Sequence, residues 1–114
     1  MEKVDYIYKG KVTEVYDGDT ITVDFDLGFF VTLRNQTIRL AEIDAAELKG
    51  RERPMGLAIR DWLRKKVLGR EVVIQTIRDG KETYGRWLGY VWLGSVCLNT
   101  QMQEEGLAPK YVKK

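Results

Sequence analysis

The order of strand-like and helix-like segments is the feature that most constrains the fold of this chain. Residues 21–27 alternate between apolar and polar side chains, which predicts a strand that presents one apolar face, made by Ile21, Val23, Phe25 and Leu27. The β-rich segment 6–16 precedes it, and Asp17-Gly18-Asp19 is a tight-turn signal that predicts a hairpin between the two. A third strand is predicted over 37–43, after a loop at 34–36.

A single clear helix follows these three strands. It is predicted over 54–68, because proline suits the first turn, an apolar stripe runs along one side, and Gly69 ends the pattern. Strands are expected at 71–77 and 87–93, with a short strand piece near Val96. A short last helix is predicted from Thr100 and Gln103 as a capping box, with Gly106 as its stop.

Three strands, a helix, two strands and a short helix form the pattern of an OB-fold. The predicted fold class is α+β, mainly β: a five-stranded barrel with a helix between strands three and four and a short C-terminal helix. At 114 residues the chain is expected to be a single domain spanning 1–114.

The sequence contains no histidine and a single cysteine, Cys97. Nucleophile pairs that depend on histidine, histidine-ligated zinc, an internal disulfide and a cysteine zinc cluster are therefore excluded. Catalysis by this chain would have to use Asp, Glu, Arg, Lys, Tyr or a metal held by oxygen ligands.

Charge is distributed unevenly along the chain. Residues 1–48 carry a net charge of −5 and residues 49–70 a net charge of +6. The basic block is either a solvated helix face or a surface that faces phosphate. No apolar signal segment opens the sequence and no long apolar run crosses it, so we expect no membrane association. A cytoplasmic location is the default expectation, and secretion the alternative if a leader has been removed.

Four carboxylates in the first half lie at the ends of predicted strands. Asp17 and Asp19 flank the hairpin turn, and Asp44 and Glu47 follow the third strand. Such carboxylates can converge on one hard cation, although each pair taken alone is more typical of a turn or a loop cap. Arg39, in the middle of the third strand, is either a structural ion-pair partner or a guanidinium aimed at phosphate.

The spacing of Arg39 and Asp44 raises a geometric condition. They are five residues apart, so an unbroken strand would place them on opposite faces. If both serve one site, the strand must end or bulge before Asp44. With Arg86 as a second arginine, the set indicates metal-assisted phosphodiester hydrolysis.

Four separated motifs resemble the staphylococcal nuclease family. They are Asp17-Gly18-Asp19-Thr20, the segment from Ile38 to Glu47, Tyr84-Gly85-Arg86, and Asn99 with Gly106-Leu107-Ala108. Their order and approximate spacing match, over nearly the whole chain. The resemblance implies an OB-type barrel and a calcium-dependent nuclease that hydrolyses DNA and RNA with little sequence specificity.

The resemblance also implies roles for particular residues. Asp19, Asp44 and the backbone carbonyl of Ala45 would bind Ca²⁺, Glu47 would act as general base, and Arg39 and Arg86 would grip the scissile phosphate. Cleavage would break the bond to the 5′ oxygen and leave 3′-phosphate ends. The residues expected to bind the substrate are Tyr84, Lys49, Arg51 and Tyr111.

Three positions depart from the family pattern. Ala45 stands where threonine is usual, Ala46 replaces the usual proline of the loop that carries Glu47, and Thr83 replaces a lysine near the substrate's terminal phosphate. The second change implies a less rigid loop and weaker catalysis.

The expected partners are DNA and RNA, with single strands preferred, and a monomer with no obligate protein partner. The main alternative is a catalytically inactive OB-fold module that binds nucleic acid, and a further one is a protein-interaction domain that uses the aromatic strand. The presence of Asp19, Arg39, Asp44, Glu47 and Arg86 favours the enzyme.

Overall fold

The computed structural model describes residues 6–81 and 87–109, and it contains the predicted barrel. The strands are β1 (Ile7–Asp17), β2 (Thr20–Asp26), β3 (Thr32–Leu40), β4 (Glu71–Lys81), β5 (Trp87–Leu93) and β6 (Val96–Cys97). The helices are the short 3₁₀ turn η1 (Gly50–Glu52), α1 (Arg53–Val67) and α2 (Leu98–Glu104).

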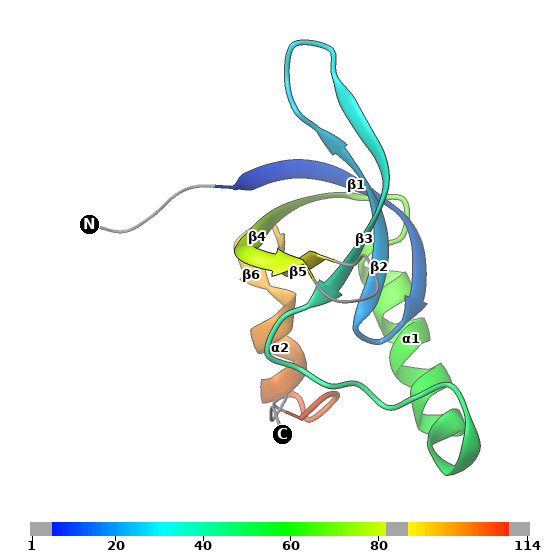
Figure 1. Ribbon diagram of the computed structural model, residues 1–114. Coiled ribbons are helices and arrows are strands. Elements are labelled where there is room, and N and C mark those ends of the chain that lie inside the picture. The colour runs from blue at the N-terminus through cyan, green and yellow to red at the C-terminus, as the bar shows by residue number, and fades with distance from the viewer. Residues whose placement is uncertain (1–5, 82–86, 110–114) are drawn as a thin grey trace.

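The sheet closes on itself into a five-stranded mixed barrel. The strand order is β3-β2-β1-β4-β5-β6, and β3 also pairs with β5. All neighbouring pairs are antiparallel except β3 and β5, which pair in parallel through Ile38–Leu40 and Trp87–Gly89. This arrangement confirms the expected α+β OB-fold (Figure 1).

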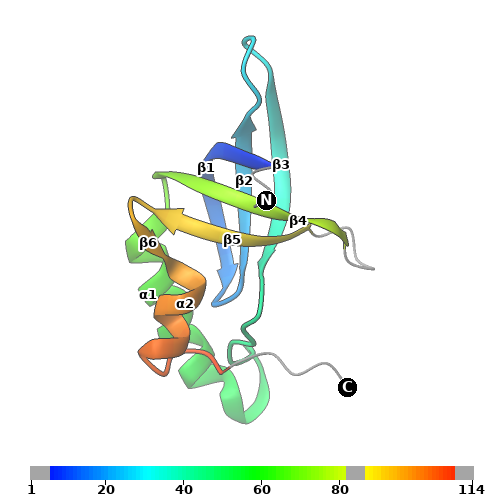
Figure 2. The same cartoon turned by 90° about the vertical axis from the view of Figure 1, so that its left-hand side faces the viewer.

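The helices cover one end of the barrel, and the β2–β3 hairpin projects from the other end (Figure 2). α1 packs against β1 and α2 against β5. The apolar stripe of α1 is buried as predicted at Ile59, Leu63 and Val67, while Trp62 is partly buried against the same core. None of the described helices has the length and apolarity needed to cross a membrane.

The core fills the barrel with branched aliphatic side chains from the inward face of each strand. Fully buried residues come from β1, β2, β3, β4, β5 and α2, including Val12, Val15, Ile21, Val23, Ile38, Leu40, Ile74, Val91 and Met102. The inward face of β2 matches the predicted alternation, except that Leu27 lies beyond the end of the strand and is 41% exposed.

Two local predictions were wrong. The loop expected at 34–36 lies inside β3, and the turn between β2 and β3 comes earlier, at residues 27–31. The capping box at Thr100 is absent, because α2 already begins at Leu98 with Cys97 as its N-cap. Gly106 does follow the end of α2, with a positive φ of 72°.

Candidate active site

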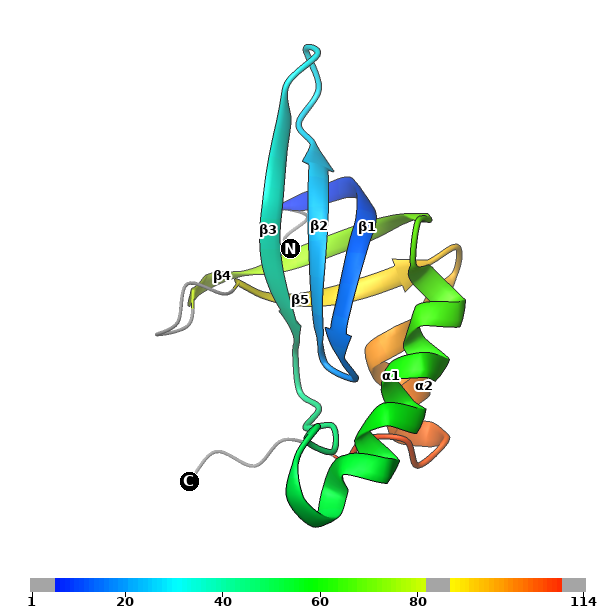
Figure 3. The same ribbon diagram turned by 90° about the vertical axis from the view of Figure 1, so that its right-hand side faces the viewer.

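The β1–β2 turn forms one wall of a cleft. Asp17 pairs with Thr20 across the hairpin, and the Asp19 N–H donates to Asp17 Oδ1 at 3.0 Å. Gly18 lies between them against α1 and the segment that follows β3. A Cβ at this position would stand 2.6 Å from Ile59 Cγ2 and 2.8 Å from Ala45 Cβ, so the close approach requires glycine. These three parts of the chain lie side by side in Figure 3.

The segment after β3 satisfies the geometric condition on Arg39 and Asp44. β3 ends at Leu40, whose N–H donates to the Asp19 carbonyl at 2.7 Å. Glu42 then adopts a positive φ of 66°, which breaks the strand pleat. As a result, Arg39 and Asp44 meet on one side, with Arg39 Nη2 3.5 Å from Asp44 Oδ1.

A second anchor for this segment is the buried side chain of Asn99. Its Nδ2 donates to the Ala41 carbonyl at 2.9 Å and to the Gly89 carbonyl at 3.0 Å, and its Oδ1 accepts from the Val91 N–H at 2.9 Å. Asn99 thereby fixes the chain leaving β3 to the neighbouring strand β5. The resemblance singled out Asn99 only as part of a motif, and its buried amide is what gives it a structural role.

Arg39 and Asp19 form the centre of the cleft. Both residues are buried, and Arg39 Nη2 lies 3.4 Å from Asp19 Oδ2. The same Asp19 oxygen accepts from the Ala45 N–H at 3.0 Å, and Asp19 Oδ1 accepts from the Thr20 hydroxyl at 3.1 Å. The Arg39 guanidinium also donates from Nη1 to the Leu40 carbonyl. Asp44 differs, because 59% of its side chain remains exposed to solvent.

The loop after Ala45 carries Glu47 and Lys49 to the cleft. The Glu47 N–H donates to Glu52 Oε1 at 2.9 Å, and the Leu48 carbonyl accepts from Arg53 Nη1 at 2.8 Å. The first turn of α1 comes so close that a Cβ on Gly56 would stand 2.3 Å from the Glu47 carbonyl oxygen. The backbone of Glu47 is therefore fixed by η1 and α1, while its side chain is exposed.

The cleft has a volume of about 340 Å³ and collects most of the predicted site residues. Asp19, Arg39, Asp44, Ala45, Glu47 and Lys49 line it. Arg51 lies on η1, exposed and outside the lining. Tyr84, Thr83, Arg86 and Tyr111 lie outside the described residues, so their predicted roles stay predictions. Leu88, two residues after Arg86, pairs with Arg39 across β3 and β5.

Two more residues of the cleft had no assigned role: Tyr16 was not singled out in the sequence, and Asp17 was only one of four candidate carboxylates. Tyr16 and Asp17 both line it. Asp17 was visible as a member of the turn signal, whereas nothing in the pattern around Tyr16 separates it from an ordinary strand residue. Burial, followed by the neighbouring Asp19, raises the pKa of Asp17 to about 6. The neighbouring Asp19 carboxylate therefore opposes ionisation of Asp17.

The donor chemistry of the cleft suits a hard cation. Its carboxylates offer only oxygen, and Asp19 and Asp44 approach the same guanidinium nitrogen. Within residues 6–81 and 87–109, however, no three carboxylate or thiol groups stand close enough together to form a ready metal cluster. At Ala45 the group placed beside Asp19 is the N–H, and the role of its carbonyl stays a prediction.

The structure thus combines a closed OB-fold barrel with an arginine that lies between two carboxylates, at the point where the β1–β2 turn meets the end of β3. The comparisons with known proteins identify the class to which this arrangement belongs. The family model described as staphylococcal nuclease homologue matches residues 37–114. The chain is 34% identical to the thermonuclease of Staphylococcus intermedius over 100 residues, which cover 85% of this chain and 56% of the relative. It is also 34% identical to the thermonuclease of Staphylococcus hyicus, over 86% of this chain and 56% of the relative.

An uncharacterized protein of Bacillus anthracis is 34% identical over 86% of this chain and 45% of its own length. The chain belongs to the staphylococcal nuclease family. It spans about half the length of the curated relatives that it matches.

Proposed function

We propose that this chain is a metal-assisted nuclease that hydrolyses phosphodiester bonds of DNA and RNA. Family membership and the convergence of Arg39, Asp19, Asp44 and Glu47 in one cleft support this proposal. Single strands are the proposed substrates, with little sequence preference, because such a cleft grips the phosphate backbone without reading base edges.

The net negative charge of the cleft supports the proposal that a cation takes part in the hydrolysis. Four carboxylates line the cleft, against two cationic side chains, Arg39 and Lys49. A phosphodiester brings a further negative charge and would be repelled by this excess. A divalent cation would offset it, and the oxygen donors suit Ca²⁺, held by Asp19, Asp44 and the Ala45 carbonyl. When bound, the cation would neutralise charge on one phosphate oxygen.

The residues of the chain then have distinct proposed tasks. Arg39, together with Arg86, would hold the scissile phosphate and stabilise charge on the pentacoordinate phosphorus. Glu47, exposed on a loop fixed by Glu52 and α1, would take a proton from the attacking water. The resulting hydroxide adds to phosphorus and the bond to the 5′ oxygen breaks. The departing 5′ oxygen takes up a proton from solvent, which gives a free 5′-hydroxyl beside the 3′-phosphate, and Glu47 later returns its proton to solvent. Lys49, Arg51, Tyr84 and Tyr111 are proposed to contact the rest of the strand.

The test is digestion of denatured DNA and of RNA by the pure protein with added calcium, with and without a chelator. We expect cleavage that the chelator stops, and end-group analysis should find 3′-phosphates. Intact substrate with calcium, magnesium and manganese alike would reject the enzyme and leave the alternative, an inactive OB-fold module that binds nucleic acid. Binding without cleavage in the same tubes would identify that module directly.

Two variants test the assigned tasks. Removing Arg39 altogether would leave buried Asp19 without its counter-charge and destabilise the fold, so Arg39→Lys is the sharper variant. It keeps a positive charge but loses the planar fork, and turnover should fall roughly 100-fold or more. Glu47→Gln should produce a similar loss. Arg70→Lys and Glu104→Gln are matched controls, because both side chains are exposed and lie outside the cleft. A near-parental rate for either test variant would contradict the assignment of that residue.

A further inference from the structure

The hairpin that joins β2 to β3 ends in an apolar turn. The Leu27 N–H donates to the Val31 carbonyl, and the Val31 N–H donates to the Gly28 carbonyl, both at 2.9 Å. The two residues at the tip, Phe29 and Phe30, have relative exposures of 97% and 108%. Two complete phenylalanine side chains therefore stand in solvent at the end of a projecting hairpin (Figure 2).

The backbone of this turn is unfavourable for phenylalanine. Phe29 and Phe30 have φ values of +55° and +63°, the left-handed conformation at both central positions of a type I′ turn. Such positions favour Asn-Gly, and a residue with a side chain costs about 1–2 kcal/mol in this conformation. This backbone strain is not needed to close the hairpin, and it places two aromatic rings in solvent. It therefore indicates that the rings contact another molecule.

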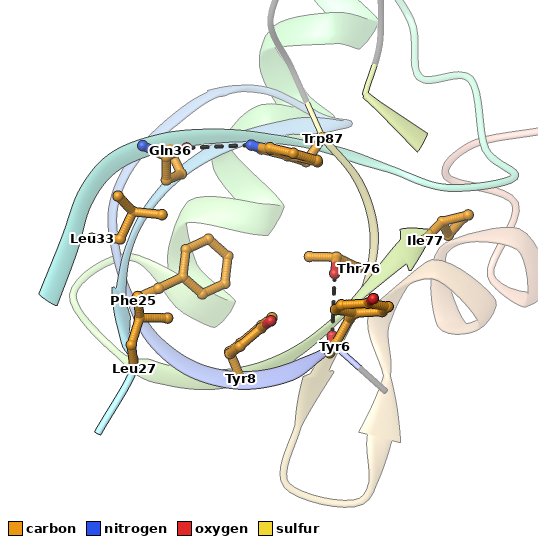
Figure 4. A pocket seen from close by; sticks show the side chains of 9 residues that line it. All are labelled: Tyr6, Tyr8, Phe25, Leu27, Leu33, Gln36, Thr76, Ile77 and Trp87. Atoms are coloured by element: carbon orange, nitrogen blue, oxygen red, sulfur yellow. Dashed lines mark hydrogen bonds between the residues drawn. The ribbon is translucent and has the colours of Figure 1, made fainter. Parts of the chain in front are cut away.

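The same end of the molecule contains an apolar pocket. It lies at the mouth of the barrel, has a volume of about 550 Å³, and is lined by residues that include Tyr8, Phe25, Thr76, Ile77 and Trp87 (Figure 4). The Tyr8 and Phe25 rings meet edge to face at 5.9 Å, and Trp87 Nε1 donates to Gln36 Oε1 at 3.2 Å. The lining is therefore mainly aromatic and aliphatic, with a few polar groups at its edge.

The pocket and the hairpin tip form one continuous apolar surface. Leu27 and Leu33, at the base of the hairpin, line the pocket and are themselves 41% and 46% exposed. The apolar surface therefore runs from the pocket through Leu27 and Leu33 to the projecting tip, and the pocket is large enough to receive such a tip.

The outer edge of β3, beside this apolar surface, has backbone groups that can pair with another strand. β3 pairs with β2 along its length, but with β5 only through Ile38–Leu40. Among the described residues, no strand covers the second edge of β3 over residues 32–37. An uncovered edge can pair with a strand of another molecule, here on the turn side of the irregularity at Arg34 and Asn35.

We propose that this surface is the interface of a symmetric homodimer in which the hairpin tip of each copy enters the barrel-mouth pocket of the other. Antiparallel approach of the two β3 edges beside the hairpin turn would bring the tip of each copy toward the barrel-mouth pocket of the other. Because tip and pocket adjoin, the exchange is reciprocal, and it closes as a dimer instead of growing into a chain.

The available area is sufficient for a stable pair. Two phenylalanines bury on the order of 400 Å². Two tips, together with the pocket walls that they cover, exceed the roughly 1,000 Å² typical of a biological interface. The dimer departs from the monomer expected from the sequence, and it leaves the catalytic cleft, at the other end of β2, open.

A second copy fits this surface better than a lipid or a nucleic acid does. The polar residues that flank the tip are of both signs: Asp24 and Asp26 on β2, Lys9 opposite Asp26 on β1, and Arg34 on β3. This balance offers no basic excess to attract an anionic membrane or a phosphate backbone. The remaining feature is apolar complementarity between a projecting tip and a pocket, and each copy of the chain has both.

The experiment is analytical ultracentrifugation of the full chain over a wide concentration range. We expect the mass to double from 13.2 kDa as concentration rises. The key variant is Phe29→Asn with Phe30→Gly, which removes the rings and installs the residues that the turn prefers. It should remain monomeric at concentrations at least tenfold above those at which the parent pairs, and should resist urea better than the parent monomer. A gain in stability together with a loss of pairing cannot come from misfolding.

Pocket and control variants complete the test. Ile77→Glu places a carboxylate at the pocket and should also abolish pairing, whereas Val96→Thr, at an exposed apolar residue elsewhere, should leave it intact. A parent that is monomeric at every concentration, or a tip variant that still pairs, would overturn the proposal. Pairing that survives Ile77→Glu but not the tip variant would overturn the assignment of the pocket. A monomeric parent that sediments with phosphatidylcholine vesicles through its tip would assign the hairpin to a membrane instead.

Discussion

Replacing Asn99 with alanine should destabilise the protein far more than an ordinary helix substitution does. Asn99 is 1% exposed and its side chain makes three hydrogen bonds of 2.9–3.0 Å to backbone groups. The Gly89 carbonyl would keep a partner, because it also accepts from the Ala41 N–H. The Val91 N–H and the Ala41 carbonyl would each lose the hydrogen bond that Asn99 makes to them.

The magnitude follows from those two groups. Each buried polar group left unsatisfied costs roughly 1–3 kcal/mol, so the free energy of unfolding should fall by about 4 kcal/mol. Against a typical total of about 5–15 kcal/mol, this leaves a folded but much weakened protein.

Urea unfolding followed by tryptophan fluorescence measures this loss. Thr100→Ala is the matched control, since Thr100 is the next residue of the same helix and is exposed. We expect the control to lie within about 0.5 kcal/mol of the parent. A loss below about 1 kcal/mol for Asn99→Ala, with an unchanged slope against urea, would refute the hydrogen-bond argument.

Two further predictions test the turn at the cleft and the pair formed by Tyr90 on β5 with Glu42 after β3. Gly18→Ala should lower the free energy of unfolding by roughly 1–3 kcal/mol, because the added Cβ would overlap Ile59 and Ala45. Adding Ala45→Gly should recover part of this loss. Equal stability of Gly18→Ala and the parent in urea would show that the turn is not tightly packed. Partial burial and a hydrogen bond to Glu42 raise the pKa of Tyr90 to about 12, so in an absorbance titration one tyrosine should ionise well above pH 10. That late step should disappear in Tyr90→Phe and move toward pH 10 in Glu42→Gln. Since the pKa is higher in the folded state, the stability that this pair adds is present below pH 10 and is lost as the pH rises through 12.

The sequence was most informative where local pattern and tertiary structure agree. β5 spans the predicted residues 87–93, and α1 begins and ends one residue before its predicted limits. The apolar periodicity of α1 matches the face it buries, and β5 is a continuous run of strand-forming residues whose buried positions are Gly89 and Val91. The hairpin between β2 and β3 was misplaced because its turn contains Phe29 and Phe30 in a conformation that favours Asn-Gly, whereas the polar run Arg34-Asn35-Gln36 looks like a loop and lies in an exposed strand.

Most residues of the cleft could be named from the sequence, but their arrangement could not. The spacing of Arg39 and Asp44 predicted only that the strand had to end or bulge between them. The strand ends at Leu40, and the positive φ of Glu42 then turns the chain; no sequence signal marks this conformation. Tyr16 could not be found, because its place in the cleft depends on how the turn packs against α1 and the segment after β3.

The distances around Asp19 indicate how a structural role and the proposed metal-binding role can share one carboxylate. The Ala45 N–H and the Thr20 hydroxyl lie at 3.0 and 3.1 Å, within normal hydrogen-bond range, whereas Arg39 Nη2 is at 3.4 Å from Asp19 and 3.5 Å from Asp44. Charge-assisted hydrogen bonds of full strength are about 2.7–2.9 Å long. The short contacts hold the turn and the loop together, and under the proposed function they would persist when substrate binds. The two long contacts are the weaker ones, and exchanging them for a phosphate would move the guanidinium without releasing the loop that carries Glu47.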